Sequence, residues 1–188
     1  MSRAHNQTPI PVIRRKRSRG NSLIEFTLVG IPLMFILIST FEMARGMWIY
    51  HTLAYAAKEG TRFVITKGND CATSPNSCAV KLQDVAKKIQ YAGLGLDPTQ
   101  LQVRFVSLTR TIGYESLQTA LSDTTTYWPA NAPGSASADI GADPGEDLEI
   151  DITYPFQSAI AFFWPGAGPG FTFGTFTLPA SSKEQIQF

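Results

Sequence analysis

The sequence predicts an α+β fold: a long amino-terminal helix that continues into a small domain with a short helix and a three- to four-stranded antiparallel sheet. Three observations support this prediction. An apolar run covers residues 23–41, the helical pattern then continues to residue 66, and short segments of alternating apolar and polar residues follow. We therefore divide the chain into a basic leader (1–20), a long helix (21–66) and an outer domain (67–188).

The leader is strongly basic. It contains six of the sixteen cations of the chain and no acid, so the remaining residues carry a net charge of −5. Because lysine and arginine are retained on the cytoplasmic side of a membrane span, the leader is predicted to be cytoplasmic and the outer domain extracytoplasmic. Such a tail can also bind nucleic acid, but its position beside an apolar run favours anionic lipid headgroups, and we predict no nucleic acid partner.

The apolar run has the length of a single membrane-spanning helix. Its 19 residues, Leu23 to Phe41, are close to the roughly 20 needed to cross about 30 Å of hydrocarbon. The alternatives are a buried helix of a soluble protein, which would not need the upstream cations, and a cleaved secretory signal. No small-x-small cleavage site follows Phe41.

Glu25 is the one charged residue inside the run. A carboxylate at membrane depth costs about 2.5–3.5 kcal/mol, and less near the interface. Glu25 therefore either reaches the headgroups or has a partner in an assembly. One such partner is the amine that cleavage between Gly20 and Asn21 would create, since an ion pair is stronger in low dielectric, although desolvation offsets much of the gain.

The stretch Gly20-Asn-Ser-Leu-Ile-Glu25-Phe26 resembles the processing site of type IV prepilins, where a prepilin peptidase cuts after glycine and leaves glutamate as the fifth mature residue. Residues 18–66 as a whole resemble the TadE-like family of the tight-adherence (Tad/Flp, type IVb) pilus system. The residues that carry the resemblance are Arg19, Gly20, Glu25, Phe26, Pro32, Glu42, Arg45 and Ala56-Ala57-Lys58-Glu59-Gly60-Thr61-Arg62. Asn21 differs from the apolar first residue common in prepilins, and the leader is long for the class.

This resemblance implies a pilin-like fold and a minor pilin or pseudopilin that takes part in assembly of a Tad-type pilus for adhesion and surface attachment. It implies processing at Gly20 and Asn21 and an assembly role for Glu25 and Phe26. The implied partners are prepilin peptidase, other pilin subunits, Tad assembly proteins and membrane lipid. The implied location is the bacterial inner membrane, crossed once, or the pilus itself. The alternative is an uncleaved, single-pass anchor for an extracytoplasmic binding domain.

Gly30 and Pro32 interrupt the apolar run, and a kink is expected because proline removes a backbone donor and clashes with the preceding turn. Two interpretations stay open. The kink is an ordinary one that a membrane helix tolerates, or it is a weak point that lets the helix bend or stretch while a filament packs.

After the run, the pattern indicates an amphipathic helix. Residues at three- and four-residue spacing form a stripe, namely Met43, Met47, Tyr50, Ala54 and Ala57. Small residues along this helix permit close packing, either on the chain's own domain or on neighbouring subunits. Trp48 and Tyr50 are predicted to lie at the membrane interface.

Cys71 and Cys78 are the only cysteines. Outside the cytoplasm they should form a disulfide, which closes a short loop and contributes about 2–3 kcal/mol. A metal or redox role is disfavoured, because there is no second Cys or His cluster and the spacing is not Cys-x-x-Cys.

In the outer domain we predict a helix over 79–94, stopped by Gly93 and Gly95, and strands at 101–109, 148–154 and 171–178, with Pro155 ending the second. Residues 113–146 are predicted to be a long loop with one helical turn near 115–121. The apolar segment 156–170 is too short to span a membrane. Burial on the sheet is favoured for it; a partner surface and a contact with lipid are the alternatives.

No combination of residues typical of catalysis is present, and we predict no enzyme activity, cofactor or metal. An acidic cluster comprises Asp139, Asp143, Glu146, Asp147, Glu149 and Asp151. A solvated loop and the outer face of a strand are favoured for it, with a calcium site as the alternative.

Overall fold

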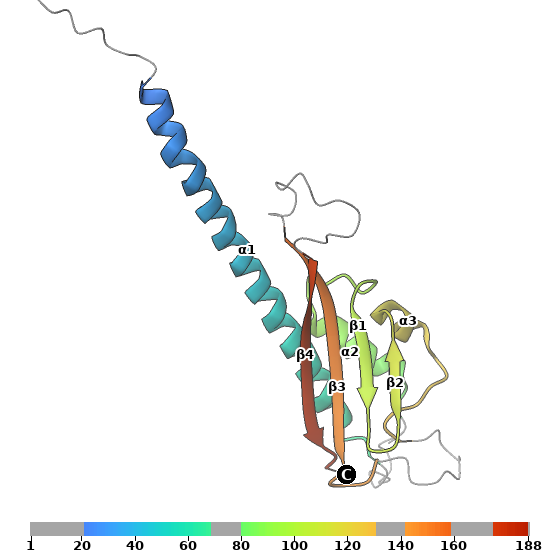
Figure 1. The fold of residues 1–188 in the computed structure, drawn as a ribbon. Coiled ribbons are helices and arrows are strands. Elements are labelled where there is room, and N and C mark those ends of the chain that lie inside the picture. Colours follow the sequence, from blue (N-terminus) through green and yellow to red (C-terminus); the bar gives the residue numbers. More distant parts are fainter. Residues whose placement is uncertain (1–20, 69–79, 131–141, 159–174, 188) are drawn as a thin grey trace, which may run out of the picture. The chain divides into compact units, whose positions relative to one another are not determined.

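The structure is a computed structural model, and it describes residues 21–68, 80–130, 142–158 and 175–187. The described residues form three helices, α1 (Asn21–Val64), α2 (Leu82–Ala92) and α3 (Leu117–Ser122). Four strands accompany them, β1 (Gln102–Val106), β2 (Thr111–Tyr114), β3 (Asp147–Gln157) and β4 (Thr175–Gln185) (Figure 1). The predicted α+β fold, a long amino-terminal apolar helix and a small domain with an antiparallel sheet, is confirmed.

The sheet has the order β2-β1-β3-β4, and every neighbouring pair is antiparallel. The prediction that Pro155 ends a strand is wrong, because Pro155 lies within β3 opposite Thr177. The β1–β3 register ends at Gln102 and Thr153, so Pro155 lies in a part of β3 that pairs with β4 and not with β1, where a residue without an N–H is better tolerated.

The predicted end of the third strand, at residue 178, is wrong, because β4 continues through the polar residues Ser181 to Gln185. Residues 171–174 of the predicted strand lie outside the described residues. The polar residues of β4 pair with the acidic start of β3, and Lys183 Nζ lies 2.8 Å from Asp147 Oδ2. Cross-strand pairing thus extends a strand that has little apolar alternation of its own. The strand at 111–114 was not predicted; it pairs with β1 through a tight turn in which Ser107 N–H donates to the Arg110 carbonyl.

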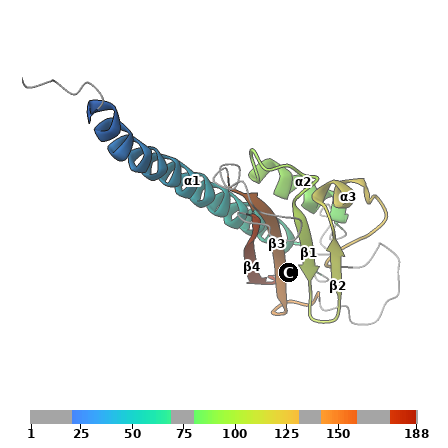
Figure 2. The same cartoon turned by 45° about the horizontal axis from the view of Figure 1, so that its top comes forward.

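Contacts divide the chain into two compact units, residues 1–38 and 39–188. In the second unit, the latter part of α1 and helix α2 lie on one face of the sheet, as both views show (Figures 1 and 2). The core between these layers is apolar. Its largest fully buried side chains from the helices and strands are Leu53, Val64, Leu82, Val85, Ile89, Phe105, Leu117, Leu148, Ile150 and Ile152.

The buried stripe of α1 differs from the predicted one. Met43, Met47 and Tyr50 are exposed, whereas Ile49 and Leu53 are buried. Apolar residues occur on all sides of this helix, so their spacing alone did not identify the face that the sheet covers. Ala57 faces the chain's own domain, and so do Ala56 and Gly60. Of the two predicted partners, the chain's own domain and neighbouring subunits, these residues therefore pack on the first.

The segment 113–146 is more ordered than a long loop. The predicted helical turn is confirmed as α3. Ser116 caps the start of this helix, because its side chain accepts a hydrogen bond from the Thr119 N–H. Trp128 then enters the core, fully buried, with its ring 5.2 Å from that of Phe105. The backbone N–H of Trp128 donates to the Val80 carbonyl, which ties this segment to the residues just before α2. Residues 131–141 lie outside the described part of the chain.

Candidate functional site

The first turns of α1 carry the residues for which sequence predicts processing and assembly. Gly20 lies outside the described residues, and Asn21 is the first residue of the helix. Glu25 and Phe26 follow in the second turn, both exposed. Because Glu25 and Phe26 are adjacent, they project in directions about 100° apart around the helix. The residue that follows the predicted cleavage point thus already belongs to α1.

The first half of α1 is apolar and uncovered. Its most apolar 18-residue window has a mean hydropathy of 2.1, and none of that window is buried against other residues. Among the described residues, α1 is the one helix whose length and composition would allow it to cross a membrane. Large apolar side chains exposed to solvent are unfavourable at about 25 cal/mol per Å². A lipid or protein environment is therefore needed around this half of the helix.

Pro32 lies inside α1, and the residues on both sides of it are helical. A methyl group on Gly30 would contact one side chain, that of Phe26, whose Cε1 atom would lie 3.9 Å away. Gly30 is therefore not required for close packing within the chain. Whether the helix is kinked at this point, and whether a kink assists filament packing, stay predictions.

The outer domain meets α1 just after the apolar run. Arg45 Nη1 donates to the Gln157 carbonyl at 3.0 Å, and its guanidinium lies 5.0 Å from the centre of the Phe156 ring. A methyl group on Gly46 would lie 3.7 Å from that ring. Arg45 also approaches Glu42 at 3.7 Å, while the second carboxylate oxygen of Glu42 is buried and has no hydrogen-bond partner in the described part of the chain. Arg45 is one of the residues that carry the family resemblance, but its contact with the end of β3 has no signal in the sequence.

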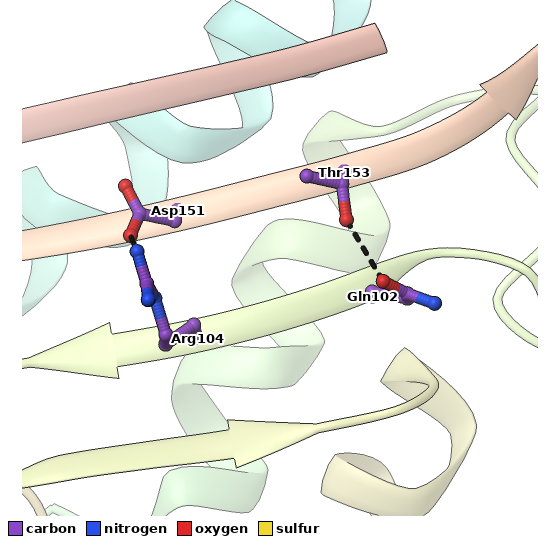
Figure 3. Close-up of polar contacts among 4 residues, drawn as sticks. All are labelled: Gln102, Arg104, Asp151 and Thr153. Atoms are coloured by element: carbon purple, nitrogen blue, oxygen red, sulfur yellow. Dashed lines mark hydrogen bonds and ion pairs between the residues drawn. The ribbon is translucent and has the colours of Figure 1, made fainter. Parts of the chain in front are cut away.

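The outer face of the sheet carries an open hollow of about 760 Å³. Its polar side chains pair across strands (Figure 3). Arg104 donates to Asp151 Oδ2 from two nitrogens, at 2.9 and 2.6 Å, and Thr153 Oγ1 donates to Gln102 Oε1 at 3.1 Å. Because these groups already satisfy one another and the hollow is open to solvent, it offers little to hold a ligand.

The acidic residues of this region do not gather. Asp139 lies outside the described residues, Asp147 pairs with Lys183, and Asp151 pairs with Arg104. Glu149 and Asp151 alternate with buried Leu148, Ile150 and Ile152, as predicted for the outer face of a strand. Within the described ranges, no three His, Cys, Asp or Glu side chains are placed to hold a metal ion.

Tyr114 of the edge strand β2 forms a polar pair with Asp123, which follows α3. Tyr114 Oη donates to Asp123 Oδ2 at 2.5 Å, and backbone N–H groups of Thr125 and Thr126 donate to the other oxygen. Hydrogen bonds from Thr126, Tyr114 and Thr125 hold the pKa of Asp123 below its ordinary value. Burial, followed by the bond to Asp123, raises the pKa of Tyr114 to about 12. This pair fixes the end of α3 against β2.

Comparison with known families points to α1. The family model described as TadE-like protein matches residues 20–62. No curated protein and no solved structure matches the chain. The matched residues begin at the predicted cleavage point, cover the uncovered apolar half of α1, and end two residues before α1 does. The resemblance seen in the sequence is thus confirmed, and the stretch that is similar to the TadE-like family nearly coincides with helix α1.

Proposed function

We propose that this chain is a membrane-anchored minor pilin or pseudopilin that takes part in assembly of a Tad-type pilus. The observation that carries the proposal is the coincidence of the TadE-like match with a helix whose first half is apolar on all sides and uncovered. The carboxyl-terminal part of the same helix is one layer of a folded domain, so the anchor and the domain share a single continuous element.

In this proposal, the basic leader stays in the cytoplasm and the outer domain lies outside the inner membrane. Support comes from the cations before the apolar run, which are retained on the cytoplasmic side. Prepilin peptidase cuts between Gly20 and Asn21, which removes the six cations of the leader and leaves the helix at the amino terminus. During assembly, the apolar half of α1 exchanges lipid for the helices of other subunits.

Glu25 would set the axial position of the subunit during this exchange. A carboxylate held in a low-dielectric environment gains much from meeting an amine and loses much when it has none. The new amino terminus of a neighbouring subunit is such an amine. Phe26, exposed beside Glu25, would pack in the same contact.

The proposal is tested by complementing a deletion strain and counting surface filaments and attached cells. We expect the deletion to reduce both, the unaltered gene to restore both, and Glu25→Gln to fail although the protein accumulates in the membrane. Glu59→Gln is the matched control, because Glu59 forms an exposed pair with Arg62 at 3.6 Å later in α1, and it should restore assembly. Normal filaments and attachment in the deletion strain would contradict the proposal.

A further inference from the structure

One end of the sheet, where β3 ends at Gln157 and β4 begins at Thr175, is fixed to α1. The β1–β3 register stops at Thr153, and β3 and β4 continue as a pair to Gln157 and Thr175. This two-stranded end meets α1 through the contacts of Arg45 with the Gln157 carbonyl and the Phe156 ring. The end of the sheet therefore lies level with the first turn after the apolar run.

A second part of the domain reaches nearly the same level. Helix α2 runs antiparallel to α1, because its later residues meet progressively earlier residues of α1: Ile89 packs at Gly60, and Gly93 lies near Ala56. The connection after α2 then meets Trp48, since a methyl group on Gly95 would lie 2.6 Å from Trp48 Cη2. Gly95 has φ +82, a conformation that glycine adopts without strain. Leu94 precedes it in this connection.

Both parts expose an apolar side chain here. In the described portion of the chain outside α1, large apolar or aromatic side chains that are mostly exposed number four: Tyr91, Leu94, Leu108 and Phe176. Leu94 is 73% exposed, and Phe176 is 50% exposed although its ring lies 4.9 Å from that of Phe156. Leu108 lies at the opposite end of the sheet, in the β1–β2 turn. Leu94 and Phe176 thus lie at the end of the domain that contacts Arg45 and Trp48 of α1.

The depth of this end follows from helix geometry, and it rests on the proposed function, in which residues 23–41 span the membrane. A rise of 1.5 Å per residue gives that run about 28 Å, the thickness of the hydrocarbon. Phe41, which is 75% exposed, then lies at the hydrocarbon boundary, and Arg45 lies one turn, about 6 Å, beyond it. The headgroup layer is about 5–8 Å thick on each side. Arg45 and the aromatic pair beside it are therefore at headgroup level.

We propose that the outer domain rests on the lipid surface through a proximal surface made of Phe41, Arg45, Leu94 and Phe176. Aromatic and apolar side chains at the headgroup boundary are stabilised by partial burial in lipid, and the Arg45 cation suits anionic phosphates. The contact would fix the tilt of the domain on its anchor while the subunit waits in the membrane.

The test is a measurement of depth in the full chain, reconstituted in nanodiscs of phosphatidylcholine and phosphatidylglycerol. With Cys71 and Cys78 replaced by serine, single cysteines are introduced as Phe176→Cys, Leu94→Cys, Leu108→Cys and Phe35→Cys and labelled with a nitroxide. Collision with oxygen, which concentrates in lipid, is compared with collision with a water-soluble nickel chelate. Leu108 is the matched control, because it is exposed as Leu94 and Phe176 are but lies at the far end of the sheet.

We expect the ratio of oxygen to nickel collisions to fall in the order 35, 176, 94 and 108, with at least a threefold difference between 176 and 108. A label at 176 that matches 108, or that is shielded from both reagents by a protein contact, would overturn the proposal. If the Phe176 variant does not fold, the label at 94 decides in the same way. If the label at 35 lies in lipid and the label at 176 lies in water, residues 23–41 still span the membrane and only the lipid contact of the domain is contradicted. If the label at 35 lies in water, both the span and the lipid contact are contradicted.

Discussion

Gly60 of α1 and Ile89 of α2 pack so closely that a methyl group on Gly60 would lie 2.9 Å from Ile89 Cγ1. The same methyl group would lie 3.1 Å from Ile150 Cδ1 of β3. Gly60 is thus the point where the long helix, the second helix and the sheet come together. Gly60 also lies inside the TadE-like match, so one residue of that segment is explained by packing within the chain itself.

We predict that Gly60→Val destabilises the outer domain by about 1–3 kcal/mol, the usual cost of adding methyl groups to a well-packed core. Urea unfolding of the full chain in detergent, followed through the emission of buried Trp128, measures the change. The matched control is Gly113→Val, because a Cβ at Gly113 meets nothing within 4 Å and valine suits a strand. Equal stability of the two variants would show that Gly60 is not a packing point.

The Tyr114–Asp123 hydrogen bond predicts a loss of stability in alkali. The folded pKa of Tyr114, about 12, is above its ordinary value of 10.0, so the stabilisation by the neutral phenol is complete below pH 10 and is lost as pH rises towards 12. Tyr114→Phe should be less stable than the unaltered chain by about 1 kcal/mol at pH 8, and this difference should shrink between pH 10 and 12. Urea midpoints at a series of pH values measure it.

The control for this prediction is Tyr91→Phe, which changes an exposed tyrosine at the end of α2 and should alter stability by less than about 0.5 kcal/mol. A Tyr114→Phe difference that stays constant up to pH 12 would contradict the account. In acid the sign reverses for Asp123. Its folded pKa is lowered from 3.8, so its contribution is present above about pH 4 and is lost as pH falls below that value.

The disulfide between Cys71 and Cys78 stays a prediction, because both residues lie outside the described part of the chain. Protein extracted without reductant should have no thiol that reacts with a maleimide and should gain two after reduction. Replacing both cysteines by serine should lower the free energy of unfolding by about 2–3 kcal/mol, and reductant should lower that of the unaltered chain equally. Two thiols that react before reduction would show that the cysteines are not paired.

Much of the fold could be predicted from the sequence where one signal dominated. The apolar run, the stop at Gly93 and the alternation around Ile150 each identified an element. Strand β2 and the polar end of β4 could not be found in this way, because their pairing partners stabilise them more than their own residues do. Trp128, within a segment rich in small and polar residues, gave no periodic signal of its burial.

The candidate site shows the same division. Glu25 and Phe26 were found because their spacing from Gly20 is a local pattern that needs no fold. The contact of Arg45 with Gln157 and Phe156 joins residues more than a hundred positions apart, so only the fold could reveal it. Gly46 leaves room for the Phe156 ring, and this contact with the end of a strand likewise has no local signal in the sequence.

The central claim is that the TadE-like helix is the processed anchor of a pilus subunit, and its amino terminus tests this most directly. Intact-mass analysis and amino-terminal sequencing should be made on protein extracted from membranes with and without prepilin peptidase. When the peptidase is present, we predict a chain that begins at Asn21. Gly20→Ala should abolish this shortened chain. Gly30→Ala is the control and should still give it, because the added methyl group at residue 30 has room. An uncut chain that begins at Met1 or Ser2 under both conditions would contradict the processed-subunit account.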